Sequence, residues 1–107
     1  MQSIKRTALL SAVILLFACA EAQASRWSAV RPYNAKLNRM AMCESGGRWH
    51  IATGNGFYGG LQFVPSTWWS VGGRGMPHWA SVLEQKYRAV LLIRRAGFSP
   101  WPVCGSA

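Results

Sequence analysis

The stretch richest in reactive groups is residues 43–47, which read Cys43, Glu44, Ser45, Gly46 and Gly47. Glu44 is one of only three acidic residues in the chain of 107 residues, and the chain contains no aspartate. A carboxyl group can donate and accept a proton during bond cleavage, and it does so best when its pKa lies near the working pH. Glu44 is therefore our candidate general acid.

The element that must position Glu44 is a helix expected to begin near Asn34, a residue type that favours the N-cap position just before a helix. Residues 46–47 are glycines, and they predict the end of this helix just after Glu44. The negative end of the helix dipole then faces the carboxyl group and favours its protonated form. The apolar positions at helical spacing are Leu37, Met40 and Ala41.

The other two acids, Glu21 and Glu84, offer little help to Glu44. A glycosidase with two carboxylates needs them about 5 to 9.5 Å apart, and we expect Glu84 on the solvated face of a later helix. A reaction with one essential carboxylate fits better. In lytic transglycosylation of peptidoglycan, one acid protonates the glycosidic oxygen and then accepts the proton of the sugar's own C6 hydroxyl.

The sequence predicts neither a metal site nor a cofactor site. His50 and His78 are isolated, and there is no aspartate to join them as a ligand. No glycine pattern of a nucleotide-binding loop is present. Among the six tryptophans, Trp49 and Trp69 are candidates for flat walls on which sugar rings stack, although packing in the core is the more common role of a tryptophan.

Residues 1–24 have the features of a secretory signal peptide: a basic start, an apolar run over 8–20, and alanines at positions 22 and 24. The run is shorter than the roughly 20 apolar residues that span a bilayer, so a membrane anchor is the weaker alternative. A lipoprotein cut before Cys19 is another. We expect a secreted or cell-wall protein with no stable membrane insertion after cleavage.

Signal cleavage removes Cys19 and leaves Cys43 and Cys104. Two cysteines in an exported domain usually form a disulfide bond, and we expect this pairing. The alternative is a Cys43 nucleophile with His50 or His78 as its base.

The remaining segments predict one small α+β domain with about three helices. Residues 25–34 are expected to form a loose lead-in, and residues 35–107 the domain itself. Asn55 and Gly56 predict the turn of a short β-hairpin. A second helix is expected from Pro65, and a last helix from Trp79 or Ser81 to Arg95.

Five runs of residues together resemble the catalytic domain of the resuscitation-promoting factors, secreted wall-cleaving proteins with a lysozyme-like fold. The match spans about residues 35–104. The runs are residues 43–49, 53–56, 58–63, 66–68 and 101–104. Arg48 and Phe57 depart from the usual asparagine and tyrosine of the family.

The resemblance implies a peptidoglycan lytic transglycosylase or muramidase that acts on the bond between N-acetylmuramic acid and N-acetylglucosamine. It implies that Glu44 is the catalytic acid, that Thr67 contacts the glycan, and that Gln62 and Tyr58 lie in the cleft beside Trp49. It also implies the disulfide bond between Cys43 and Cys104, which the cysteine count predicts independently.

The net charge of +9 indicates attraction to polyanions. We expect an exported monomer whose partners are peptidoglycan strands and anionic wall polymers, and export argues against nucleic acid. Two alternatives of other classes stay open. One is a wall-binding or signalling module without catalysis, and the other is a cationic protein that acts on membranes.

Overall fold

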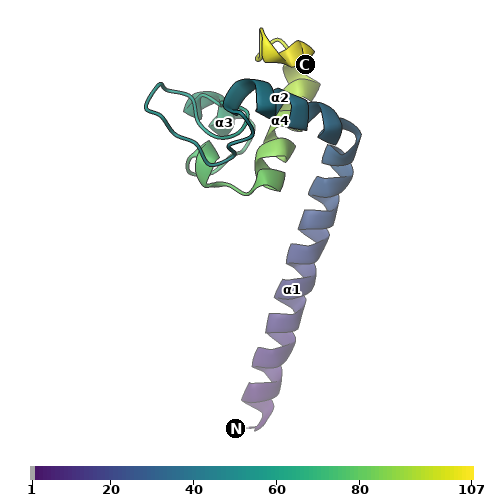
Figure 1. Cartoon of the computed structure of the whole chain (residues 1–107). Coiled ribbons are helices and arrows are strands. Elements are labelled where there is room, and N and C mark those ends of the chain that lie inside the picture. The colour runs from purple at the N-terminus through teal and green to yellow at the C-terminus, as the bar shows by residue number, and fades with distance from the viewer. Residues whose placement is uncertain (1) are drawn as a thin grey trace.

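The structure, a computed structural model, describes residues 2–107, with side chains described from residue 11 onward. One long helix projects from a body formed by the rest of the chain, and the molecule measures 61 × 30 × 23 Å (Figure 1). The α-helices are α1 (Gln2–Val30), α2 (Asn34–Ser45), α3 (Pro65–Ser70) and α4 (Val82–Ala96), and short 3-10 helices cover Arg31–Tyr33, Pro77–Trp79 and Cys104–Ser106.

The C-terminal end of α1 is held against α4. The Arg26 guanidinium donates to the Glu84 carboxylate over 2.5 Å and lies 5.1 Å from the centre of the Tyr87 ring. Val30 is fully buried. The expected loose lead-in at residues 25–34 is therefore helical, because these contacts order it.

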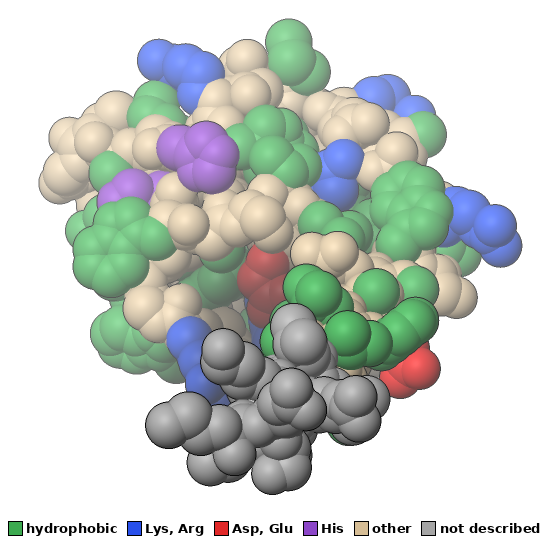
Figure 2. All heavy atoms as spheres, turned by 90° about the horizontal axis from the view of Figure 1, so that it is seen from below, with side chains coloured by type: hydrophobic (Ala, Val, Ile, Leu, Met, Phe, Trp, Pro, Cys, Tyr) green, Lys and Arg blue, Asp and Glu red, His purple; other side chains and the backbone are tan. Residues whose placement is uncertain are grey.

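The preceding part of α1 carries exposed apolar side chains from Val13 to Phe17. Figure 2 shows hydrophobic side chains gathered next to the part that is not described, with lysines and arginines spread around the rim of this face. No helix within residues 2–107 combines the length and the hydropathy of a membrane span. Met1 and the side chains of Lys5 and Arg6, which belong to the expected signal peptide, lie outside the described part.

Helix α2 begins at Asn34 and ends after Ser45, as the sequence predicts. Gly46 has a φ of 66°, in the left-handed region that glycine adopts without strain. The Gly46 amide donates to the Met42 carbonyl, which is the bond of an αL C-cap motif, and the Gly47 amide donates to the Ala41 carbonyl. Leu37, Met40 and Ala41 are buried, as their spacing predicts.

Helix α4 is capped by Ser81, whose hydroxyl oxygen accepts a hydrogen bond from the Glu84 amide over 3.1 Å. It ends at Gly97, close to the expected boundary. Its buried face includes Val90 and Leu92, and these side chains join Trp68 of α3 in the core. In the same core, the Phe63 ring makes edge contacts with the rings of Trp68 and Trp101.

The expected β-hairpin, and with it the α+β class, is wrong for the described residues. Residues 48–64 contain only two isolated bridges, Ala52 with Tyr58 and Tyr58 with Phe63. The physical reason is the backbone, which takes positive φ values at short intervals and cannot stay extended long enough to form a ladder. These φ values are 81° at Gly54, 87° at Gly56, 81° at Gly59 and 54° at Gln62.

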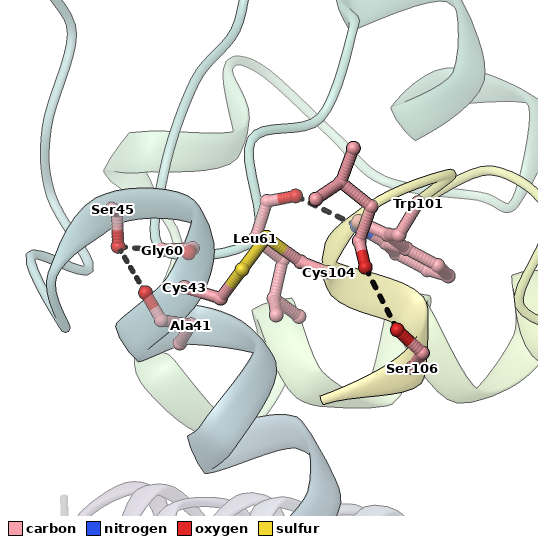
Figure 3. The surroundings of a disulfide bond; sticks show 9 residues. Ala41, Cys43, Ser45, Gly60, Leu61, Trp101, Cys104 and Ser106 are labelled. Atoms are coloured by element: carbon pink, nitrogen blue, oxygen red, sulfur yellow. Dashed lines mark hydrogen bonds between the residues drawn. A yellow bond between two sulfur atoms is a disulfide. The ribbon is translucent and has the colours of Figure 1, made fainter.

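The predicted disulfide bond between Cys43 and Cys104 is confirmed, with 5.7 Å between the two Cα atoms. It joins the last turn of α2 to the 3-10 helix Cys104–Ser106 (Figure 3). Nearby, the Trp101 indole N–H donates to the Leu61 carbonyl over 2.9 Å. The C-terminal segment is thus held to α2 by a covalent bond and to the central loop by a hydrogen bond.

Replacing Cys43 and Cys104 together with alanine should lower the free energy of unfolding by about 4 kcal/mol. The bond closes a loop with a sequence separation of 61, and losing that constraint increases the entropy of the unfolded chain. Urea unfolding measures the change. Cys19→Ser, at an exposed free cysteine, is the matched control and should leave the midpoint unchanged.

Candidate active site

Glu44 lines a cavity of about 370 Å³, which we call the acid cavity. Three segments form it: the end of α2, the loop around Phe57, and the C-terminal segment. Its lining residues are Glu44, Asn55, Phe57, Gln62, Pro100, Trp101, Pro102, Val103 and Cys104. The cavity therefore combines one carboxyl group with amide groups and flat apolar side chains, a lining typical of a ligand-binding site.

The environment of Glu44 favours its protonated form. Burial raises the pKa of the Glu44 carboxyl above its usual value. Within the part of the chain whose side chains are described, Glu44 forms no ion pair that would oppose this effect. The C-terminal end of α2 adds the negative end of a helix dipole, which acts in the same direction. These are the conditions that a general acid requires.

Glu84 forms two ion pairs and does not line the acid cavity. Its two carboxylate oxygens accept hydrogen bonds from Arg26, over 2.5 Å, and from Arg88, over 2.7 Å. Glu21 lies exposed on α1. Neither residue lines the acid cavity, so Glu44 is the one carboxylate among its described lining residues.

Gln62 and Thr67 lie close to the acid cavity. A second cavity of about 50 Å³, the threonine cavity, shares Phe57, Gln62, Pro100 and Trp101 with the acid cavity and includes Thr67. The common walls make the two cavities neighbours along one cleft. Three of the residues predicted for the site, Glu44, Gln62 and Thr67, therefore come together here.

Gln62 adopts a φ of 54°, which is unusual for a residue with a side chain. Its side-chain amide donates to the Gly59 carbonyl over 2.9 Å, which holds the side chain at the wall of both cavities. Residues kept in this region cost about 1 to 3 kcal/mol and are found preferentially at functional sites.

Trp49 and Tyr58 line neither of these two cavities. Trp49 is half-buried and packs so closely on Gly60 that an added Cβ would lie 2.3 Å from the indole ring. The Lys86 ammonium group lies 5.3 Å from the centre of the same ring. The Tyr58 ring stacks on His78, with 5.2 Å between centroids. Trp49 thus supports the loop behind the site.

A buried hydrogen-bond junction at Gly60, which the sequence analysis missed, connects α2 to α4. The Ser45 hydroxyl donates to the Gly60 carbonyl over 2.8 Å (Figure 3). The Gly60 amide donates to Gln85 Oε1 over 3.0 Å, and Gln85 Nε2 donates to the carbonyls of Trp49 and Ala80. A glutamine four residues before a buried alanine, on the apolar face of α4, was the signal available in the sequence.

Histidine geometry indicates a structural role. His50 Nδ1 lies 2.8 Å from the His78 carbonyl oxygen and donates to it. Among the described residues, no three side chains of the types that bind metals come together.

Comparison with known proteins relates the chain to one protein family and to several resuscitation-promoting factors. Residues 31–104 match the family described as Transglycosylase-like domain. The resuscitation-promoting factor Rpf of Micrococcus luteus is 55% identical over 67 residues, which cover 63% of this chain and 30% of that protein. RpfE of Mycobacterium tuberculosis is 48% identical over 73 residues, covering 68% and 42%, and RpfC is 50% identical over 68 residues, covering 64% and 49%. The chain therefore spans less than half of the length of these relatives.

Gln85→Leu should destabilise the protein by about 2 to 4 kcal/mol. The change keeps a side chain of similar size but leaves the Gly60 amide and the Trp49 and Ala80 carbonyls without their partner, and buried polar groups without partners are costly. Denaturant unfolding measures the loss. An unfolding midpoint equal to that of the wild type would show that the junction contributes nothing.

Glu44→Gln should stabilise the protein at neutral pH. A pKa raised in the folded state means that folding disfavours the carboxylate, so the penalty appears as pH rises through the unfolded value of about 4.3 and persists above the folded value. Thermal unfolding at pH 7 should therefore favour the variant, and the difference should vanish below about pH 4. A variant less stable than the wild type at pH 7 would contradict the assigned environment.

Proposed function

The chain belongs to the transglycosylase-like domain family and contains a resuscitation-promoting factor catalytic domain, and from this we propose that it cleaves peptidoglycan glycan strands. The bond cleaved joins N-acetylmuramic acid to N-acetylglucosamine, and the reaction is lytic transglycosylation. The observation that carries the proposal is a single half-buried carboxyl group with a raised pKa in the acid cavity.

In this mechanism Glu44 begins protonated and donates its proton to the glycosidic oxygen as the bond from that oxygen to the anomeric carbon breaks. The resulting Glu44 carboxylate then accepts the proton of the C6 hydroxyl of the muramic acid. The freed oxygen bonds to the anomeric carbon and closes an anhydro ring. The carboxyl group returns to its starting form, and no water is consumed.

The surroundings of Glu44 support this reaction over hydrolysis. An inverting hydrolase needs a second carboxylate that activates water, and a retaining one needs a second carboxylate as nucleophile. Glu84 is held by Arg26 and Arg88 instead. The apolar side chains of Phe57 and Trp101 offer surfaces on which a sugar ring can stack.

We assign the amide of Gln62 and the hydroxyl of Thr67 to hydrogen bonds with the glycan, since Gln62 lines both cavities and Thr67 lines the threonine cavity. Trp49, expected in the cleft from the sequence, we assign to support of the Gly60 loop.

We further propose that residues 1–24 direct export and that the protein acts at the cell wall. Cleavage after Ala24 would remove the exposed apolar part of α1. It would keep Arg26 and Val30, whose contacts join the end of α1 to α4. The exported domain would therefore retain its packing.

Purified protein incubated with insoluble peptidoglycan should release fragments that end in an anhydro sugar, which are lighter by one water than hydrolytic products and are identified by mass spectrometry. Glu44→Gln should slow this release by about 10²- to 10⁴-fold, because the amide cannot donate the proton.

Glu84→Gln is the matched control, since it removes the other carboxylate of the domain but should keep the anhydro products. Fragments with reducing ends would show that the reaction is hydrolysis and not transglycosylation. No fragments from folded wild-type protein would instead favour a module that only binds the wall.

A further inference from the structure

Four aromatic side chains are linked outside the two cavities, three by ring contacts and the fourth through the backbone of Gly75. The Tyr58 and His78 rings stack with 5.2 Å between centroids, and the His78 and Trp79 centroids lie 5.6 Å apart. Trp79 packs on Gly75, where an added Cβ would lie 3.1 Å from the indole ring. The indole N–H of Trp69 donates to the Gly75 carbonyl over 2.7 Å. We call Tyr58, His78, Trp79 and Trp69 the aromatic row.

The two tryptophans of the aromatic row present a large apolar surface to solvent. Trp79 is 72% exposed and Trp69 is 55% exposed. Their contacts with Gly75 hold both rings in place, so little conformational entropy would be lost when a ligand binds them. Exposed and fixed aromatic rings of this kind are typical of a binding surface.

The aromatic row is separate from the cleft that contains Glu44. Thr67, in the threonine cavity, and Trp69 are two positions apart on α3, which turns the helix by about 200°. Trp68, between them, is fully buried. The threonine therefore faces the cleft, while Trp69 faces away from it.

Basic side chains flank the aromatic row. Arg74 is exposed and directly precedes Gly75. The Arg95 guanidinium donates to the Ser70 hydroxyl, next to Trp69, over 3.1 Å. The acid nearest in sequence to the row's tryptophans, Glu84, is neutralised by Arg26 and Arg88. The surface is therefore aromatic and cationic, which complements a polysaccharide that carries carboxylates.

We propose that the aromatic row, with Arg74 and Arg95, is a second glycan-binding surface that holds wall polysaccharide outside the catalytic cleft. Sugar rings stack on Trp69 and Trp79, and the arginines contact carboxylates on the muramic acid substituents. The inference rests on the proposed function for its substrate class. The surface retains the enzyme on an insoluble substrate between cleavage events.

Sedimentation with insoluble peptidoglycan tests this surface, in a Glu44→Gln background that prevents cleavage. Trp79→Ala should weaken binding about tenfold, since it removes a stacking surface. The change lies at a largely exposed side chain, and thermal unfolding verifies that the variant is folded. Trp27→Ala, at a 44% exposed tryptophan on α1, is the matched control and should bind as the parent does. Equal binding by the Trp79 variant would overturn the proposal.

A cleavage assay separates this surface from the cleft. With Glu44 intact, Trp79→Ala should cleave a short soluble glycan fragment at the wild-type rate, because such a fragment occupies only the cleft. A parallel loss of cleavage would overturn the proposal by making Trp79 part of the catalytic site. Failure of the proposed function gives a different result from failure of this inference. In that case the wild-type protein would leave both the insoluble peptidoglycan and the soluble fragment intact, whether or not it binds them.

The contribution of the arginine charges to glycan binding is tested separately. Arg74→Gln should weaken binding to peptidoglycan severalfold at low salt and reduce the dependence of binding on salt. Binding to chitin, a neutral polymer of N-acetylglucosamine, should be unchanged by the same substitution. An equal loss on both polymers would overturn the role of carboxylates.

Discussion

The site depends on anchoring of the residues on both sides of Glu44. Cys43 is joined covalently to Cys104, and the Ser45 hydroxyl bonds to the Gly60 carbonyl. The helix ends immediately afterwards at Gly46. With both neighbours held, the backbone of Glu44 has little freedom, and its side chain opens into a cavity that Cys104 also lines. The same contacts that close the fold therefore build the cleft.

This arrangement places an acid where folding alone would not favour one. Burial raises the pKa of Glu44, which means that the charged form is destabilised at neutral pH. Glu84 is in the opposite situation, because two arginines compensate the negative charge of its carboxylate. Its ion pairs also hold α1 to α4. One glutamate thus stabilises the fold, while the other lacks compensation and remains available for proton transfer. Functional sites commonly carry such a cost in stability.

The tryptophans divide in a similar way. Trp68 and Trp101 are buried and donate their indole hydrogens to backbone carbonyls, so they supply much of the core of a small domain. Trp69 and Trp79 remain exposed and meet at Gly75. The adjacent residues Trp68 and Trp69 differ in exposure because successive residues of α3 point about 100° apart, so that one side chain enters the core and the other meets solvent. Sequence composition alone could not distinguish these roles.

The positions of α2, α3 and α4, the cysteine pairing and the place of Glu44 at a helix end were determined by the sequence itself. Each depends on a local signal, namely apolar spacing, a glycine stop, or the count of cysteines left after an expected signal peptide. The hairpin was wrong because an Asn55 and Gly56 turn signal says nothing about the positive φ values that interrupt the flanking backbone. Only the tertiary structure decided that Gln62 and Thr67 share a cleft wall, that Tyr58 stacks on His78, and that Gln85 bonds to Gly60. These relations join residues distant in the chain, and they form only when the helices pack, because packing and not local preference selects which faces meet.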